Sequence, residues 1–207
     1  MDIYLIRHGE TDWNKVKKLQ GVTDVPLNAY GIELAEKTAK GLKDISFDII
    51  YSSPLIRARR TAEIIRGDRK IEIIPTEGLL EISFGDYEGL TYLPETYNIP
   101  VSGFQKFFDD PEHYDTPPNG ESLQHLRERT TAFVRGIMND PAHEDKTILM
   151  ASHGAAIRGI LSGLQNLPVA AFWSGPVHKN CGVTKLHVEH GKFTVEFENR
   201  TFYENAL

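Results

Sequence analysis

The chain has 207 residues, of which 40% are hydrophobic and 25% are charged, and this balance is typical of a single globular domain that buries its own core. Its formal net charge of -6 argues against a nucleic-acid-binding protein, because such proteins usually carry a basic surface. A lone cysteine, a start without a secretory signal and no apolar run near the roughly 18 residues of a membrane span favour a cytoplasmic protein with no membrane partner.

Strands and helices are expected to alternate through the first third of the chain. The apolar run from Ile3 to Ile6 indicates a buried strand, and Asn28 is a suitable cap for a helix whose apolar face reaches Leu42. Ser52-Ser53-Pro54 predicts a helix start with proline at its first position. In chain order, the predicted elements are a strand over 3–6, a helix over 29–42, a strand over 47–51, a helix over 54–66 and a strand over 71–74.

The segment from Gly78 to Gly120 is predicted to be irregular, because glycines and prolines interrupt it throughout. Its many aromatic side chains argue against disorder. We expect residues from about 90 to 120 to form a cap with short helices over a functional site, within one domain that spans residues 1–207. The aromatic residues of this cap are Tyr92, Tyr97, Phe104, Phe107, Phe108 and Tyr114.

The rest of the chain returns to the alternating pattern. The predicted elements are a helix over 121–139, a strand over 147–151, a helix from Gly154 to Leu164, and strands over 183–189 and 193–198 around a turn at 190–191. Repeated strand–helix units predict an α/β fold, here a three-layer α/β/α sandwich with a mostly parallel central sheet and the cap as an insertion.

Polar residues follow several predicted strands, and in open α/β sheets ligands bind beyond the carboxyl ends of the strands. Arg7 and His8 end the first strand, Arg57 lies one helical turn beyond the second, and His153 follows the strand over 147–151. Each alone has an ordinary explanation as strand punctuation, a solvated helix face or a helix cap. Together they would bring two histidines and two arginines to one edge of the sheet.

Such a cluster suits a phosphoryl group, because the arginine fork matches phosphate oxygens and a neutral histidine is a nucleophile near pH 7. The glycine after each histidine, Gly9 or Gly154, is expected to allow close backbone approach and to present a free N–H group. Loss of an alkoxide also needs a proton donor. Glu81, which lies between apolar neighbours, is the candidate.

Four blocks occur in order along residues 3–160. They are Arg7-His8-Gly9-Glu10-Thr11 with Trp13-Asn14, Ser52-Ser53-Pro54-Leu55-Ile56-Arg57-Ala58 with Thr61-Ala62, Leu80-Glu81 with Gly85-Asp86-Tyr87-Glu88-Gly89, and Ser152-His153-Gly154. On these blocks the chain resembles the histidine phosphatase superfamily, the phosphoglycerate mutase-like group of branch 1.

The resemblance implies a role for each matching residue. His8 would be the phosphorylated nucleophile, and Glu81 would protonate the leaving oxygen and then activate water. The implied phosphate-binding or substrate-binding residues are Arg7, Asn14, Gln20, Gly21, Arg57, Glu81, His153 and Gly154, of which Arg7, Arg57 and His153 would also stabilise the transition state. Members of the family need no metal, and we expect no cofactor. On an extended chain His187 and His190 would point to opposite faces, which agrees with this expectation.

Three functions remain open at this point. A metal-independent phosphatase that acts through phosphohistidine on small phosphorylated metabolites is favoured. A cofactor-dependent phosphoglycerate mutase is less favoured. The bacterial mutases have a larger insertion in which a tyrosine is followed by several prolines, and residues 91–118 contain no such run. A silent phosphate-binding domain is disfavoured by the presence of His8, Glu81 and His153. The expected partner is a small phosphomonoester, whose identity stays open, and a homodimer through a sheet edge is compatible with the sequence.

Overall fold

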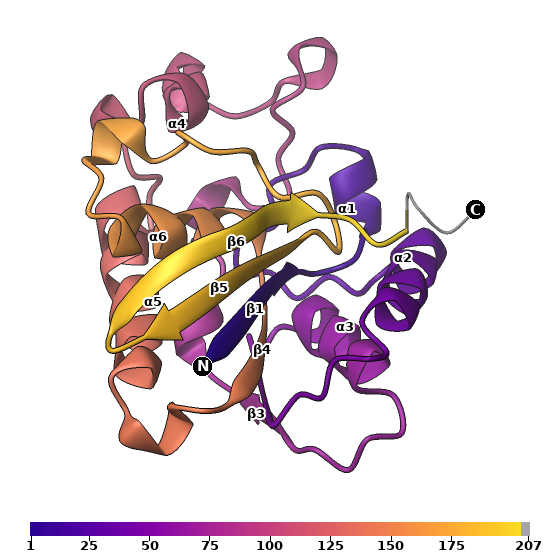
Figure 1. Ribbon diagram of the computed structural model, residues 1–207. Helices are drawn as coiled ribbons and strands as arrows, with labels where there is room; N and C mark the ends of the chain where they lie inside the picture. Colours follow the sequence, from indigo (N-terminus) through magenta and orange to yellow (C-terminus); the bar gives the residue numbers. More distant parts are fainter. Residues whose placement is uncertain (204–207) are drawn as a thin grey trace.

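The computed structural model describes residues 1–203, which form an α/β fold around one six-stranded sheet (Figure 1). The strands are β1 (Asp2–Arg7), β2 (Ile49–Ser52), β3 (Ile73–Pro75), β4 (Thr147–Ser152), β5 (Val183–Glu189) and β6 (Lys192–Arg200). Their order is β3-β2-β4-β1-β5-β6, in which the first four strands pair in parallel and β5 runs antiparallel to both of its neighbours. The predicted, mostly parallel sheet is therefore confirmed.

Helices cover both faces of the sheet. The α-helices of residues 1–203 are α1 (Asp12–Lys15), α2 (Ala29–Gly41), α3 (Ile56–Arg66), α4 (Lys106–Asp109), α5 (Leu123–Met138) and α6 (Gly154–Leu164). One face packs against α2 and α3 and the other against α5 and α6, which gives the three predicted layers (Figure 1). Successive residues of β1 alternate between the two cores, because Leu5 packs on the α5–α6 side and Ile6 on the α2–α3 side.

One predicted helix start differs from the structure, and one short helix was not predicted. Helix α3 begins at Ile56 instead of Pro54, and its N-cap residue, Leu55, makes no side-chain cap bond. The proline therefore lies in the turn before the helix. The short helix α1 was not predicted, although Thr11 and Asn14 form a reciprocal capping box at its start.

The cap is irregular, as predicted, and has a second part that was not. Between β3 and α5 the chain forms α4 and single 3₁₀ turns, including Pro94–Thr96, Ser102–Gln105 and Pro111–His113. The segment after α6 packs against it, because the Trp173 indole N–H donates to the carbonyl of Phe107. In Figure 1 both parts lie at the top of the view. Among residues 1–203, no helix has the length and apolar character needed to cross a bilayer.

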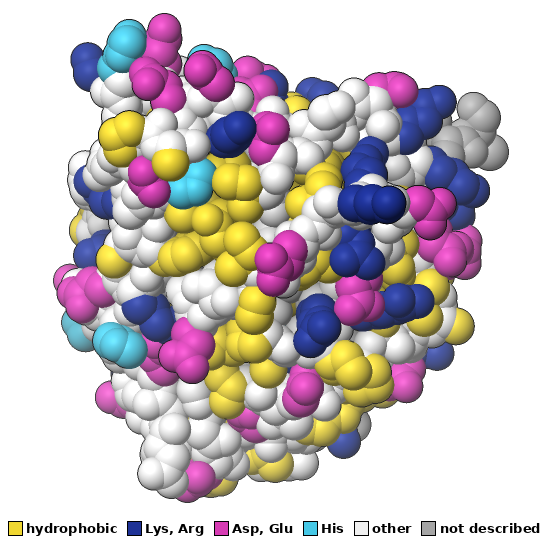
Figure 2. All heavy atoms as spheres, turned by 90° about the horizontal axis from the view of Figure 1, so that it is seen from below, with side chains coloured by type: hydrophobic (Ala, Val, Ile, Leu, Met, Phe, Trp, Pro, Cys, Tyr) yellow, Lys and Arg dark blue, Asp and Glu magenta, His cyan; other side chains and the backbone are white. Residues whose placement is uncertain are grey.

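The surface opposite the cap mixes charges of both signs. Figure 2 views the molecule from below: hydrophobic side chains cover much of the middle of that face, and the Lys and Arg side chains on its right half have Asp and Glu side chains between them. This distribution agrees with the net charge of -6. It gives this face none of the uniform positive charge that binds a phosphate backbone.

Candidate active site

The carboxyl ends of β1, β2 and β4 border a cavity of about 240 Å³ beneath the cap. The predicted site residues that line it are Arg7, His8, Asn14, Gln20, Gly21, Arg57, Glu81 and Gly154. His153 is fully buried behind this lining, with its ring centre 5.1 Å from that of His8. The structure therefore brings together residues that are as far apart in sequence as Arg7 and Gly154.

His8 is held in one orientation and in one charge state. Its side chain is buried, and Nδ1 lies 2.7 Å from the carbonyl oxygen of Gly9. Because a carbonyl only accepts hydrogen bonds, Nδ1 carries the proton and Nε2 keeps its lone pair. Burial, followed by the charges of Arg57 and Arg7, holds the pKa of His8 well below its usual value. At pH 7 the side chain is therefore a neutral, oriented nucleophile.

The two arginines of the cavity are fixed by backbone carbonyls. The guanidinium group of Arg57 donates to Gly21 at 2.6 Å and to Thr23 at 2.8 Å, and that of Arg7 donates to His178. Burial lowers the pKa of Arg57 to about 10, so it remains charged at pH 7. Within residues 1–203, neither arginine pairs with a carboxylate, and Nε of each lacks a partner. The cationic side chains that line the cavity (Arg7, Lys17, Lys18 and Arg57) outnumber its carboxylates (Glu10 and Glu81), and this balance favours an anion.

The two glycines that follow the histidines have different roles. Gly154 begins α6 and lines the cavity, and a Cβ atom there would meet nothing closer than Arg7 Nε at 3.6 Å. A Cβ atom on Gly9 would lie 2.4 Å from the carbonyl oxygen of Gly31. The backbone N–H of Gly9 already donates to Thr61 Oγ1 at 3.0 Å. The prediction of a free N–H at Gly9 is therefore wrong, because this N–H is already paired. A glycine is required at this position because α2 packs closely against the segment that follows β1.

Glu81 lies at the start of α6. Its carboxylate lines the cavity and accepts the backbone N–H groups of Ala156 at 2.9 Å, Ala155 at 3.2 Å and Ile82 at 3.0 Å. The positive end of the helix dipole adds to these bonds. The carboxylate that faces the phosphate cavity is therefore also a cap for α6, a connection that the sequence analysis missed.

The loop after α1 holds the other predicted residues in place. Asn14 Oδ1 accepts the backbone N–H of Thr11, and Gln20 Oε1 accepts the Thr11 hydroxyl at 2.8 Å. Gly21 adopts a φ of 52°, and a Cβ atom there would overlap the carboxylate of Glu88. Gly21 is thus needed for its conformation as well as for its carbonyl, which binds Arg57.

Glu88 fixes that loop, although no role for it was predicted from the sequence. Its carboxylate accepts the backbone N–H groups of Val22 at 2.9 Å, Thr23 at 2.8 Å and Phe84 at 3.1 Å. The carbonyl of Thr23 in turn binds Arg57. A carboxylate in a glycine-bounded loop was the only signal, and it does not reveal which N–H groups it binds.

Asn180 and an aromatic wall complete the cavity, and the sequence analysis assigned no role to Asn180 or Trp173. The Asn180 side-chain amide donates to the carbonyl of His8 at 3.1 Å. The aromatic wall, as we use the term, comprises Phe84, Tyr92, Phe107, Phe108 and Trp173, all of which line the cavity. Two further histidines lie outside the lining of the cavity: His113 is exposed and paired with Asp110, and His178 is buried.

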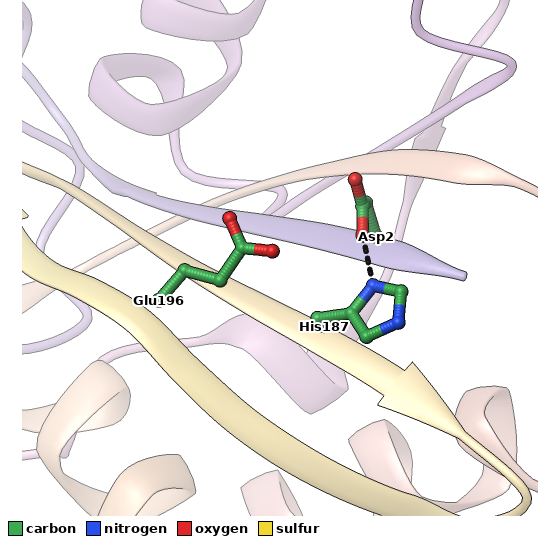
Figure 3. A group of neighbouring side chains, drawn as sticks. All are labelled: Asp2, His187 and Glu196. Carbon is green, nitrogen blue, oxygen red and sulfur yellow. Dashed lines mark hydrogen bonds and ion pairs between the residues drawn. The ribbon is translucent and has the colours of Figure 1, made fainter.

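A second cluster of titratable groups lies at the opposite end of β1. The ligand atoms of Asp2, His187 and Glu196 approach one another within 4.8 Å (Figure 3). The Lys185 ammonium group donates to Asp2 at 2.8 Å and to Glu196 at 2.9 Å, and His187 bonds to Asp2 at 2.7 Å. These carboxylates are therefore already neutralised by a side chain. His190 lies in the turn between β5 and β6, as predicted, with a φ of 51°.

The family model described as "Histidine phosphatase superfamily (branch 1)" matches residues 3–201. An "Uncharacterized phosphatase PhoE" of Bacillus subtilis is 38% identical over 160 residues, which cover 77% of this chain and 75% of that protein. A "Probable phosphoglycerate mutase GpmB" of Proteus mirabilis is 31% identical over 190 residues, which cover 92% of this chain and 86% of that protein.

A solved structure has the same fold. A phosphoserine phosphatase of Entamoeba histolytica, solved as a mutant in complex with phosphoserine, superposes with a TM-score of 0.81 at 34% identity and covers 96% of each chain. The predicted three-layer α/β fold is therefore confirmed by a structure of a phosphatase as well as by the topology of the sheet.

Proposed function

Because this chain belongs to the histidine phosphatase superfamily, branch 1, we propose that it hydrolyses small phosphomonoesters through a covalent phosphohistidine at His8. One observation carries the proposal. The neutral His8, with its lone pair on Nε2, borders the same cavity as two arginines that have no carboxylate partner. A phosphate dianion would be attracted to this charge, and Arg7 and Arg57 supply what a metal ion supplies elsewhere.

The reaction has two steps. In the first, Nε2 of His8 attacks phosphorus, the bond to the ester oxygen breaks, and the protonated carboxyl group of Glu81 gives its proton to the departing oxygen. In the second, water attacks the same phosphorus atom, Glu81 takes a proton from that water, and the electrons of the P–N bond return to Nε2. The products are an alcohol and inorganic phosphate, and Arg7, Arg57 and His153 stabilise the charge on the phosphoryl oxygens in both steps.

The leaving group faces the cap. We assign the whole chain to one domain in which residues 90–120 form this cap over the cavity. The aromatic wall lines the same cavity as the proposed phosphate-binding residues, and the ring centres of Phe107 and Trp173 are 5.2 Å apart. Flat apolar surfaces of this kind stack on planar or apolar groups. We therefore expect phosphate esters of aromatic or apolar alcohols to be better substrates than esters of small polar alcohols.

A mutase is the alternative, and the relative named as a phosphoglycerate mutase favours it. A mutase that uses a bisphosphorylated intermediate must hold a second phosphate group. Among the described residues that line the cavity, the arginines are Arg7 and Arg57, and both belong to the first phosphate site. Lys17 and Lys18 border the cavity but are exposed. Hydrolysis is therefore the function that the site supports better.

The test is hydrolysis of p-nitrophenyl phosphate in excess EDTA by the wild type and His8→Ala, with the exposed His113→Ala as a matched control. We expect metal-independent turnover in the wild type and the control, none in His8→Ala, and an acid-labile phosphoenzyme in wild type quenched during turnover. Turnover by His8→Ala at the wild-type rate would overturn the proposal. Conversion of 3-phosphoglycerate in the presence of 2,3-bisphosphoglycerate, without release of phosphate, would establish the mutase instead.

A further inference from the structure

His153 has one paired and one unpaired ring nitrogen, although its side chain is fully buried. Its Nε2 lies 2.7 Å from the hydroxyl oxygen of Ser53, a residue 100 positions away in the sequence. Its Nδ1 has no hydrogen-bond partner among residues 1–203. A buried polar nitrogen is normally paired, so this one calls for a ligand.

The hydrogen bonds of Ser53 decide which nitrogen carries the proton. The Ser53 hydroxyl oxygen accepts the backbone N–H of Leu55 at 3.4 Å, and His153 is its other bonded neighbour. The hydroxyl hydrogen therefore has the Nε2 lone pair as its acceptor. A neutral imidazole carries one N–H, so the proton of His153 must be on Nδ1. A series of hydrogen bonds therefore runs from the Leu55 backbone N–H through the Ser53 hydroxyl to Nε2 of His153.

The charge state of His153 makes this tautomer matter. Burial, followed by the electrostatic effects of Arg57 and the other groups around the ring, holds the pKa of His153 well below its usual value. A neutral ring offers a proton on one nitrogen and a lone pair on the other. Toward a phosphoryl oxygen, the first is attractive and the second is repulsive. An uncharged histidine that donates to a reacting oxygen is known from other enzymes.

We propose that Ser53 is a positioning residue that holds His153 in the Nδ1–H tautomer, so that His153 donates a hydrogen bond to the phosphoryl group bound beside His8. The proposal rests on the proposed function for the identity of that group. Ser53 does not line the cavity, so it acts only through His153. When the partner that sets the tautomer of a functional histidine is removed, activity typically falls by roughly 10- to 100-fold.

The neighbouring serine is a matched control. Ser52 is also buried, but its hydroxyl donates to the carbonyl of Ser53 at 2.8 Å and does not bond to His153. Ser52→Ala and Ser53→Ala therefore remove the same atom from adjacent residues of one turn. If the proposal holds, only the second substitution changes the tautomer.

The tautomer can be read directly from the nitrogen chemical shifts of ¹⁵N-histidine-labelled protein, with and without inorganic phosphate. We expect a protonated Nδ1 on His153 in the wild type and in Ser52→Ala, a shift of this signal on adding phosphate, and a mixture of tautomers in Ser53→Ala. A wild-type His153 protonated on Nε2 would overturn the proposal without any variant, so a misfolded Ser53→Ala does not protect it.

Kinetics provide the second readout. Ser53→Ala should lower kcat for p-nitrophenyl phosphate by roughly 10- to 100-fold with a smaller change in KM, and Ser53→Thr, which keeps the hydroxyl, should recover most of the loss. Equal kcat values for Ser53→Ala and Ser52→Ala would refute the positioning role. If the wild type hydrolyses nothing, the proposed function fails, whereas the nitrogen shifts with inorganic phosphate still decide the role of Ser53.

Discussion

At the amino end of β1 the ammonium group of Lys185 lies between the carboxylates of Asp2 and Glu196, whereas at the carboxyl end two guanidinium groups have no carboxylate partner. The first cluster is partly exposed and its charges are matched within the sheet. The second cluster is buried, and Arg7 and Arg57 are held by backbone carbonyls that supply geometry without neutralising the charge.

The difference separates a structural charge cluster from a binding site. Where each cation already has an anion, little is left to attract a ligand, and the pair adds modestly to stability. Where buried cations are left unmatched, the protein forgoes stability and gains a strong preference for an anion. The same two arginines also lower the pKa of His8, so the charge that favours an anion helps to keep this ring neutral as well.

Removal of an unmatched arginine should have the largest effect. We expect Arg57→Ala to lower kcat/KM for p-nitrophenyl phosphate by roughly 100- to 1,000-fold, because it removes a buried donor that faces developing charge in the cavity. Arg59 is two residues along α3, is exposed and pairs with Glu63, so Arg59→Ala should leave kcat/KM unchanged. Comparable losses in both variants would show that general surface charge, and not the buried cluster, binds the substrate.

The contrast between Arg57 and Arg59 also shows what the sequence could predict. The ends of the predicted strands and the phase of the helix after Ser53 follow from local patterns, and they indicate that Arg7, Arg57 and His153 share one edge of the sheet. The order of the strands in the sheet was not predicted. Each of these residues can be recognised by its type and by its position just after an apolar run. The layers of the fold were predictable for the same reason.

The partners of these residues were not predictable. The bonds from Ser53 to His153, and from Trp173 to Phe107, join segments that are distant in the sequence and have no shared pattern. A hydroxyl or an indole bonds to whatever packing brings near it. Gly9 was misjudged for a related reason, because the contact that requires a glycine there comes from Gly31 on another element.

The Glu81 carboxylate sharpens the comparison, since it faces the cationic cavity from the start of α6. We expect Glu81→Gln to slow hydrolysis of an alkyl phosphate by roughly 100-fold, because a poor leaving group needs a proton. The loss should be much smaller for p-nitrophenyl phosphate, whose leaving group departs as a stable anion. The ratio of the hydrolysis rates for the two substrates is insensitive to general damage to α6, because such damage lowers both rates. An unchanged ratio would remove Glu81 from the role of general acid.

The unmatched cluster should also make the protein sensitive to acid. Burial lowers the pKa of His8 and His153 well below the usual value and that of His178 to about 3, so these rings stay neutral in the folded state. Below about pH 6.5 the unfolded chain binds more protons than the folded one, and stability must fall as pH falls. Each ring contributes about 1.4 kcal/mol per pH unit until its folded pKa is reached.

Urea unfolding at a series of pH values measures this slope. His8→Asn removes one of the three protonation events, so its unfolding free energy should fall less steeply with acid than that of the wild type. Parallel slopes for the two proteins would mean that His8 is protonated in the folded state over this range, and would then remove the basis for a neutral nucleophile.

The matched cluster should give the smallest effect. Burial alone would lower the pKa of Lys185, but its bonds to Asp2 and Glu196 outweigh this and raise it, so the ammonium group stays charged throughout the working range. Lys185→Met leaves the two carboxylates without their cation and should lower the unfolding free energy by about 1 kcal/mol. Adding Asp2→Asn to this variant should recover part of the loss, because it relieves the repulsion between the carboxylates. Neither change should alter kcat/KM. If Lys185→Met slowed turnover as Arg57→Ala is expected to do, the two ends of β1 would be coupled, and the distinction between a structural cluster and a binding site would no longer hold.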